Sequence, residues 1–81
     1  METRVAVISI IVADAAAAEA LNSLLHSYAQ YIIGRMGIPY KEKSINIISV
    51  AIDAPMDKIN ALTGALGRIS GINAKAVCSK L

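Results

Sequence analysis

Arg35 is the residue of this chain whose chemistry is best suited to holding a small anion. Gly34 and Gly37 lie close to it in the sequence and leave its side chain accessible beside a predicted turn. A planar guanidinium can donate two parallel hydrogen bonds to a carboxylate or a phosphate. Pairing with an Asp or Glu across a sheet is the alternative role. We therefore predict Arg35 as a candidate ligand-binding residue.

Gly64 is a second candidate because it interrupts a predicted helix. A glycine inside a helix costs about 1 kcal/mol relative to alanine, and Gly64 points away from the apolar stripe of its helix. Close approach of a ligand or of a second subunit would account for it. A frayed helix end around Gly67 and Gly71 is an equally good explanation.

The other reactive side chains form no catalytic or metal-binding pattern. His26 is the single histidine and Cys78 the single cysteine, and they lie on different predicted elements, whereas a metal site needs several such ligands. The sequence has no Cys-x-x-Cys, no histidine-centred triad and no phosphate loop. The acids have the positions of helix caps or solvated surface residues: Asp14, Glu19, Glu42, Asp53 and Asp57. We expect no metal, no cofactor and no catalytic residue.

Charge and composition narrow the range of partners and compartments. Eight Lys and Arg against six Asp and Glu give a net charge of +2 without a basic stripe, so direct binding to nucleic acid is not expected. A lone cysteine suits the reducing cytoplasm. No segment approaches the roughly 20 apolar residues that span a membrane, and Glu2 before a short apolar run argues against a secretory leader.

Hydrophobic patterning predicts alternating strands and helices in one domain over residues 1–81. Arg4–Val12 is a β-branched run typical of a buried strand, and Asp14 is expected to cap a helix from Ala15 to about Ala29. The remaining predicted elements are a strand over 31–36, a connection through Gly37-Ile38-Pro39 and Lys41-Glu42-Lys43, a strand over 44–52, a helix that begins at Asp53-Ala54-Pro55 and ends at Gly71, and a strand over 72–79.

This order predicts an α+β fold of the ferredoxin-like βαββαβ type. Both strand-helix-strand crossovers should be right-handed. The two helices then cover one face of a four-stranded antiparallel sheet, with the first and third strands in its centre. The two halves of the chain resemble each other, because Leu21-Asn22-Ser23-Leu24 matches Ile59-Asn60-Ala61-Leu62.

The two central strands are apolar on both faces, although the helices cover only one. Side chains alternate along a strand, so one set points toward the helices and the other away from them. A chain this short with 56% apolar residues needs further cover. We predict that the outward set, which has a serine at matching positions of both strands, is the interface of a dimer or tetramer: Val5, Val7, Ser9, Ile11, Ile45, Ile47 and Ser49.

Four segments resemble one known family. They are Leu25-His26-Ser27-Tyr28, Tyr31 to Pro39, Ile48 to Asp53, and above all Asn60 to Ile72, and they are similar to the iron-only hydrogenase system regulators. The similarity spans nearly the whole chain. That family consists of small stand-alone domains that resemble ACT domains and the C-terminal domain of the nickel-responsive regulator. The resemblance implies a ferredoxin-like, ACT-like fold and oligomerisation, and it carries over no catalytic residue.

The resemblance also bears on ligand sites. ACT-like domains bind small effectors between subunits, often near the turn after the first strand, where many have a glycine. That turn is Val12-Ala13-Asp14 in this chain, so Asp14 joins Arg35 and Gly64 as a ligand-binding candidate. The histidine and cysteine constellation of the nickel-responsive regulator is absent from the sequence, and no nickel site is implied.

We therefore expect a cytoplasmic, non-enzymatic regulatory domain that self-associates, senses a small effector and acts through a protein partner. Two alternatives remain open. A small ferredoxin-like enzyme would need a polar cavity between helices and sheet, whereas a purely structural assembly module would bind no ligand.

Overall fold

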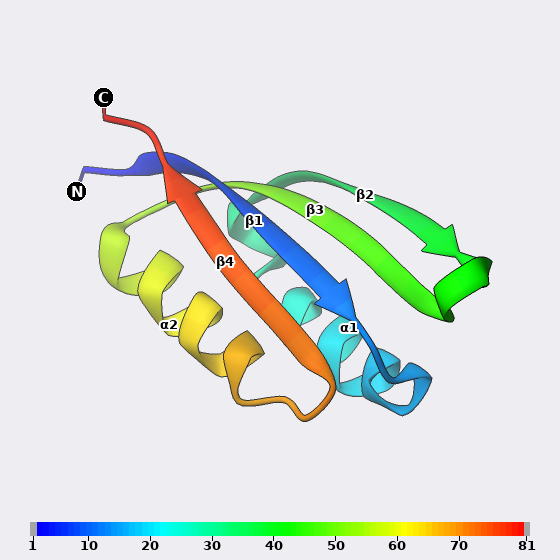
Figure 1. Cartoon of the computed structure of the whole chain (residues 1–81). Coiled ribbons are helices and arrows are strands. Elements are labelled where there is room, and N and C mark those ends of the chain that lie inside the picture. The colour runs from blue at the N-terminus through cyan, green and yellow to red at the C-terminus, as the bar shows by residue number, and fades with distance from the viewer. Residues whose placement is uncertain (1, 81) are drawn as a thin grey trace.

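A computed structural model describes residues 2–80 of the chain. Its main elements are β1 (Arg4–Val12), α1 (Ala18–Ser27), β2 (Ile32–Tyr40), β3 (Ile45–Ala54), α2 (Met56–Gly67) and β4 (Ile72–Cys78) (Figure 1). Short 3-10 turns lie between them: η1 (Ala15–Ala17), η2 (Ala29–Tyr31) and η3 (Lys41–Lys43). The predicted βαββαβ order is confirmed. Residues 1 and 81 of the predicted domain lie outside the described residues.

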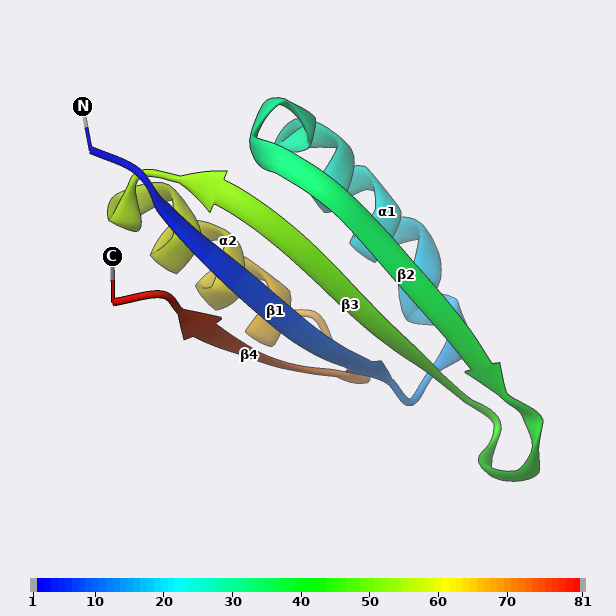
Figure 2. The same cartoon turned by 90° about the horizontal axis from the view of Figure 1, so that it is seen from above.

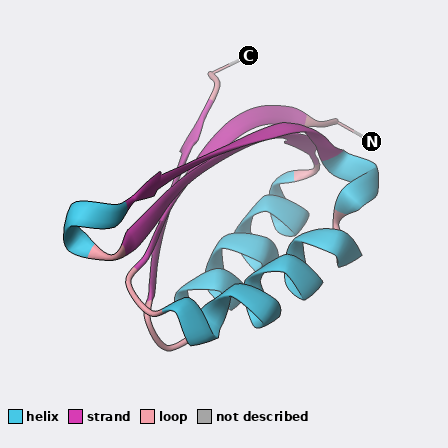
Figure 3. Cartoon of the chain, turned by 90° about the vertical axis from the view of Figure 1, so that its right-hand side faces the viewer, coloured by secondary structure: helices cyan, strands magenta, loops and turns pink. Residues whose placement is uncertain are grey.

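The four strands form one antiparallel sheet in the order β2-β3-β1-β4 (Figure 2). β1 pairs with β3 from Arg4 opposite Ala54 to Val12 opposite Asn46, and with β4 on its other side. The first and third strands are therefore central, as predicted, and β2 and β4 are the edge strands. Both helices pack against the same face of the sheet, and the opposite face carries no helix (Figure 3). This is the ferredoxin-like fold.

The core lies between the helix layer and the sheet. Alternate residues of β1 and β3 point into it, and each helix presents apolar residues at a spacing of three and four. The largest fully buried side chains come from both layers: Ile8, Ile10, Val12, Val50 and Ile52 from the sheet, and Leu21, Leu25, Ile59, Leu62 and Leu66 from the helices. Every buried side chain within residues 2–80 is apolar.

β2 is longer than the sequence predicts. The prediction ends this strand at Met36 and assigns Gly37-Ile38-Pro39 to the connection, whereas β2 continues to Tyr40 and Ile38 pairs with Ile47 of β3. Glycine and proline fit here because an edge strand has no neighbour on its outer side. The connection is therefore only η3 and Ser44, which has a left-handed φ of 54°.

The first helix begins as predicted but in a different form. Asp14 caps it, since the Asp14 carboxylate accepts the N–H of Ala16 at 2.9 Å. The first turn is the 3-10 helix η1, however, and the α-helix that follows ends at Ser27 rather than near Ala29. The extra turn η2 then leads into β2.

The second helix is shorter than predicted at both ends. Asp53 and Ala54 are still part of β3, and Pro55 lies just before the helix, where its carbonyl accepts the N–H groups of Lys58 and Ile59. A proline has no N–H to lose at this position. The helix ends at Gly67, and Gly71 instead shapes the turn into β4.

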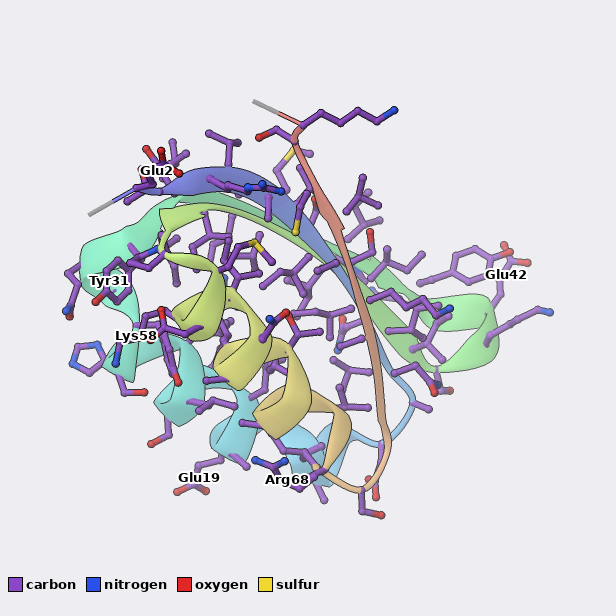
Figure 4. All side chains as sticks on the ribbon, turned by 90° about the vertical axis from the view of Figure 1, so that its left-hand side faces the viewer. Glu2, Glu19, Tyr31, Glu42, Lys58 and Arg68 are labelled. Atoms are coloured by element: carbon purple, nitrogen blue, oxygen red, sulfur yellow. The ribbon has the colours of Figure 1, made fainter. Side chains whose placement is uncertain are left out.

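The hairpin formed by β2 and β3 extends beyond the helix layer. The molecule is elongated, with principal extents of 42 × 18 × 17 Å, and Glu42 at the hairpin tip lies far from both helices (Figure 4). All of β2 from Ile33 to Tyr40 is exposed. The outer part of the sheet therefore has apolar side chains that no helix covers.

Replacing Gly71 with alanine should lower the free energy of unfolding by about 1–3 kcal/mol. Gly71 has a φ of +86°, and a Cβ there would lie 2.6 Å from Cβ of Asp14. Urea unfolding followed by circular dichroism at fixed protein concentration measures the change. The matched control is Gly67→Ala, which meets nothing within 4 Å and should leave stability unchanged or raise it by up to about 1 kcal/mol. Equal losses in both variants would contradict this account.

Candidate functional site

The first candidate surface is the sheet face that the helices leave uncovered, which we call the open face. Strand register and alternation place on it Gly34, Met36, Ile38 and Tyr40 of β2, Ile45, Ile47, Ser49 and Ala51 of β3, Val5, Val7, Ser9 and Ile11 of β1, and Asn73, Lys75 and Val77 of β4. One row across the sheet is Met36, Ser49, Ser9 and Lys75, and the next is Ile38, Ile47, Ile11 and Asn73.

The apolar side chains of the open face are largely in contact with water. In the centre, Val7 and Ile47 are each 41% exposed. On the edge strand β2, Met36 is 68% and Ile38 57% exposed. An apolar patch that continues over three adjacent strands is uncommon on a monomer and usually marks a contact surface.

All seven residues predicted for the subunit interface lie on the open face. Ile45 and Ser49 are half-buried and the other five are exposed. Ser9 and Ser49 lie directly opposite each other across the β1–β3 pair, as their matching positions in the two strands suggest. The positions are as expected, and whether a second subunit covers them stays a prediction.

Part of the β4 border of the open face is polar, next to the exposed Val77. Lys75 lies beside Ser9, and Asn73 lies beside Ile11. These four residues and Ala74 line a shallow depression of about 260 Å³. The apolar part of the face is therefore centred on β1, β3 and β2, with a positive charge at one side.

The second candidate surface is a groove between α1 and β2, which we call the α1–β2 groove. It has a volume of about 400 Å³ and is lined by Asn22, Leu25, His26, Ala29, Ile32 and Arg35. Arg35 Nη2 donates a hydrogen bond to Oδ1 of Asn22 at 3.1 Å. The guanidinium thus lies against α1, on the helix side of β2, and its partner is a neutral amide rather than a carboxylate.

The three residues predicted to bind a ligand lie in different surroundings. Arg35 lines the α1–β2 groove. Asp14 caps η1 and packs against the Gly71 turn. Gly64 lies on the exposed side of α2, where an added Cβ would be 3.7 Å from Nη1 of Arg68. The structure therefore separates these three residues, and Arg35 is the one that lines the α1–β2 groove.

The sequence prediction lacks several residues that contribute to the two surfaces, among them Met36 and Ile38 on the open face and Asn22 and His26 in the groove. The prediction ends the second strand at Met36 without assigning that strand's residues to a face, and it assigns Ile38 to the connection because Gly37 and Pro39 are typical turn residues. Asn22, which accepts a hydrogen bond from Arg35, and His26, which lines the same groove, were not predicted as site residues, although their spacing of four residues places both on one side of α1. That spacing was a usable signal, but only the packing of β2 beside α1 reveals its meaning.

The described part of the chain has neither a cluster of metal-binding side chains nor a membrane-spanning helix. Within residues 2–80, no three His, Cys, Asp or Glu side chains lie close enough together to hold a metal ion. Over the same residues, no helix is long and apolar enough to cross a membrane.

Fold and surfaces together define a small ferredoxin-like domain with an open apolar sheet face. The chain belongs to the TM1266-like family, which is described as "Iron-only hydrogenase system regulator, putative" and whose profile matches residues 4–76. A similar solved structure is that of the uncharacterized protein TM1266 from Thermotoga maritima. It has a TM-score of 0.93 and 36% sequence identity, over 98% of this chain and 100% of that chain. No curated protein matches this chain.

Replacing Gly64 with alanine should raise the free energy of unfolding by about 0.5–1 kcal/mol. An added methyl group meets only the end of the flexible Arg68 side chain, at an ordinary contact distance. Urea unfolding measures the gain, and sedimentation velocity checks that self-association is unchanged. A loss of stability or of association would instead mean that another molecule approaches the backbone at Gly64.

Proposed function

We propose that this protein is a non-enzymatic regulatory domain of an iron-only hydrogenase system, and that it works as a homo-oligomer in the cytoplasm. Two copies pack through their open faces, a small effector binds, and the assembly acts on a protein partner. The observation that carries this proposal is the open face, which is apolar over three adjacent strands and exposed. The family description supports the regulatory role.

The size of the open face suits a second copy of the chain. Strands lie about 4.8 Å apart and rise about 3.4 Å per residue, so four strands paired over seven to nine residues present a flat area of roughly 500 Å². Two such faces together contribute about 1,000 Å², which is the lower limit for a specific interface. Packing of a sheet on a sheet at about 10 Å is also a common arrangement.

The free energy available from this contact is sufficient for association. Seven apolar side chains of the face are 41–72% exposed: Val5, Val7, Ile11, Met36, Ile38, Ile47 and Val77. Completing their burial contributes roughly 1–2 kcal/mol each, or about 10 kcal/mol per subunit. The cost of association is about 4–15 kcal/mol. The sum over two subunits exceeds this cost, so a stable dimer is expected.

The other two hypotheses have less support. An enzyme would have its active site between the helices and the sheet, but that space is filled by closely packed apolar side chains such as Ile8, Val50 and Leu62. A purely structural module would need no cavity for a ligand, whereas the α1–β2 groove has polar side chains beside an apolar floor.

Replacing Ile47 with glutamate should convert the assembly into a monomer of 8.5 kDa. Ile47 is in the centre of the open face, and a twofold dimer would bury the new carboxylate twice without a partner. We expect the dissociation constant to rise at least about 100-fold. Sedimentation velocity across micromolar concentrations measures this, and circular dichroism checks that the variant folds.

The matched control is Ala61→Glu, which adds the same charge on the exposed side of α2. It should sediment like the wild-type protein. A wild-type protein that is monomeric at these concentrations, or an Ile47→Glu protein that keeps its oligomeric mass, would contradict the proposal.

A further inference from the structure

We propose that the α1–β2 groove binds a small organic anion, specifically a carboxylate with a short aliphatic body. The binding does not depend on self-association. Its role as the effector site does rest on the function proposed above.

The polar side of the groove presents hydrogen-bond donors. Arg35 uses Nη2 for Asn22, and a guanidinium has five N–H donors in all, so others stay free for a ligand. Because the Asn22 Oδ1 accepts this bond, the amide nitrogen of Asn22 is also free to donate. His26, one helical turn further along α1, borders the same space. A carboxylate, which only accepts hydrogen bonds, matches this set.

The other side of the groove is apolar. Leu25 is 2% exposed and belongs to the core, Ile32 is half-buried and packs against it, and the small side chain of Ala29 leaves space above them. An aliphatic body would gain contact with these residues, while a bare inorganic anion would not. The volume of about 400 Å³ is at the lower end of the range for small-molecule sites, which indicates a ligand of few atoms.

A local irregularity of β2 lies at the groove. The pairing of β2 with β3 shifts register between Ile32 and Gly34, so Ile33 bulges out of the ladder and is 64% exposed. Bulges change the direction of the side chains that follow them and are often found beside binding sites. With Arg35 two residues after Ile33, the bulge lies where it can orient the guanidinium toward α1.

The test is a titration of the uniformly ¹⁵N-labelled chain with 4-methylpentanoate, followed by amide chemical shifts. We expect shifts confined to α1, η2 and β2, with a dissociation constant on the order of 1 mM.

Arg35→Gln should weaken binding at least about tenfold. The matched control is Arg68→Gln, directly after the end of α2, which should bind like the wild-type protein. Ala29→Leu, which fills the apolar side, should weaken binding as well and serves if Arg35→Gln does not fold.

Two matched probes define the ligand class. Neutral 4-methylpentan-1-ol and inorganic phosphate should each bind at least about tenfold more weakly than 4-methylpentanoate. Absence of groove shifts at 20 mM carboxylate, shifts that persist unchanged in both groove variants, or equal binding of either probe would overturn the proposal. Chemical shifts report binding in a monomer and in an oligomer alike, so this result is separate from the sedimentation test of assembly.

Discussion

Two short helices can cover only one face of a four-stranded sheet, and the rest of the structure follows from this limit. On the covered face, alternate residues of β1 and β3 meet the apolar stripes of α1 and α2 and form a core of apolar side chains. On the other face, the same alternation leaves valine and isoleucine in water, at 41% exposure for Val7 and Ile47. A domain of this size is stable only if it buries most of its apolar residues. The uncovered set is therefore best explained by contact with another molecule, and its area fits a second copy of the chain.

β2 is the element that connects the two candidate surfaces. Neighbouring residues on a strand point to opposite faces, so Arg35 lines the α1–β2 groove while Met36 lies on the open face. A ligand that holds Arg35 against α1 therefore contacts β2, the same edge strand that contributes to the proposed interface between subunits. Such a ligand would change assembly only to the extent that it binds the two states of β2 with different affinity. The proposed regulatory function thus has a physical basis in one strand, with the ligand on one side and the partner subunit on the other.

Much of this fold could be predicted from the sequence, and the errors have identifiable causes. The bounds of β1 are predicted residue for residue, because a β-branched run between polar ends is unambiguous. β2 is predicted too short, since Gly37 and Pro39 are turn residues in most settings but are tolerated at a sheet edge. The part of the open face on β1 and β3 is predicted from alternation alone, without the contributions of β2 and β4. The α1–β2 groove could not be predicted, because the contact between Arg35 and Asn22 depends on how the edge strand packs beside the helix.

The central claim is that the open face of one subunit lies against the open face of another. An isotope-filtered NOE experiment on a mixture of ¹³C-methyl-labelled and unlabelled chains tests it most directly, because it detects only contacts between different molecules. The account predicts intermolecular NOEs to the methyl groups of Ile11, Ile47 and Val7, and none to the buried Leu62 of α2. Intermolecular NOEs that involve the helices and leave the open-face methyl groups without any would contradict it.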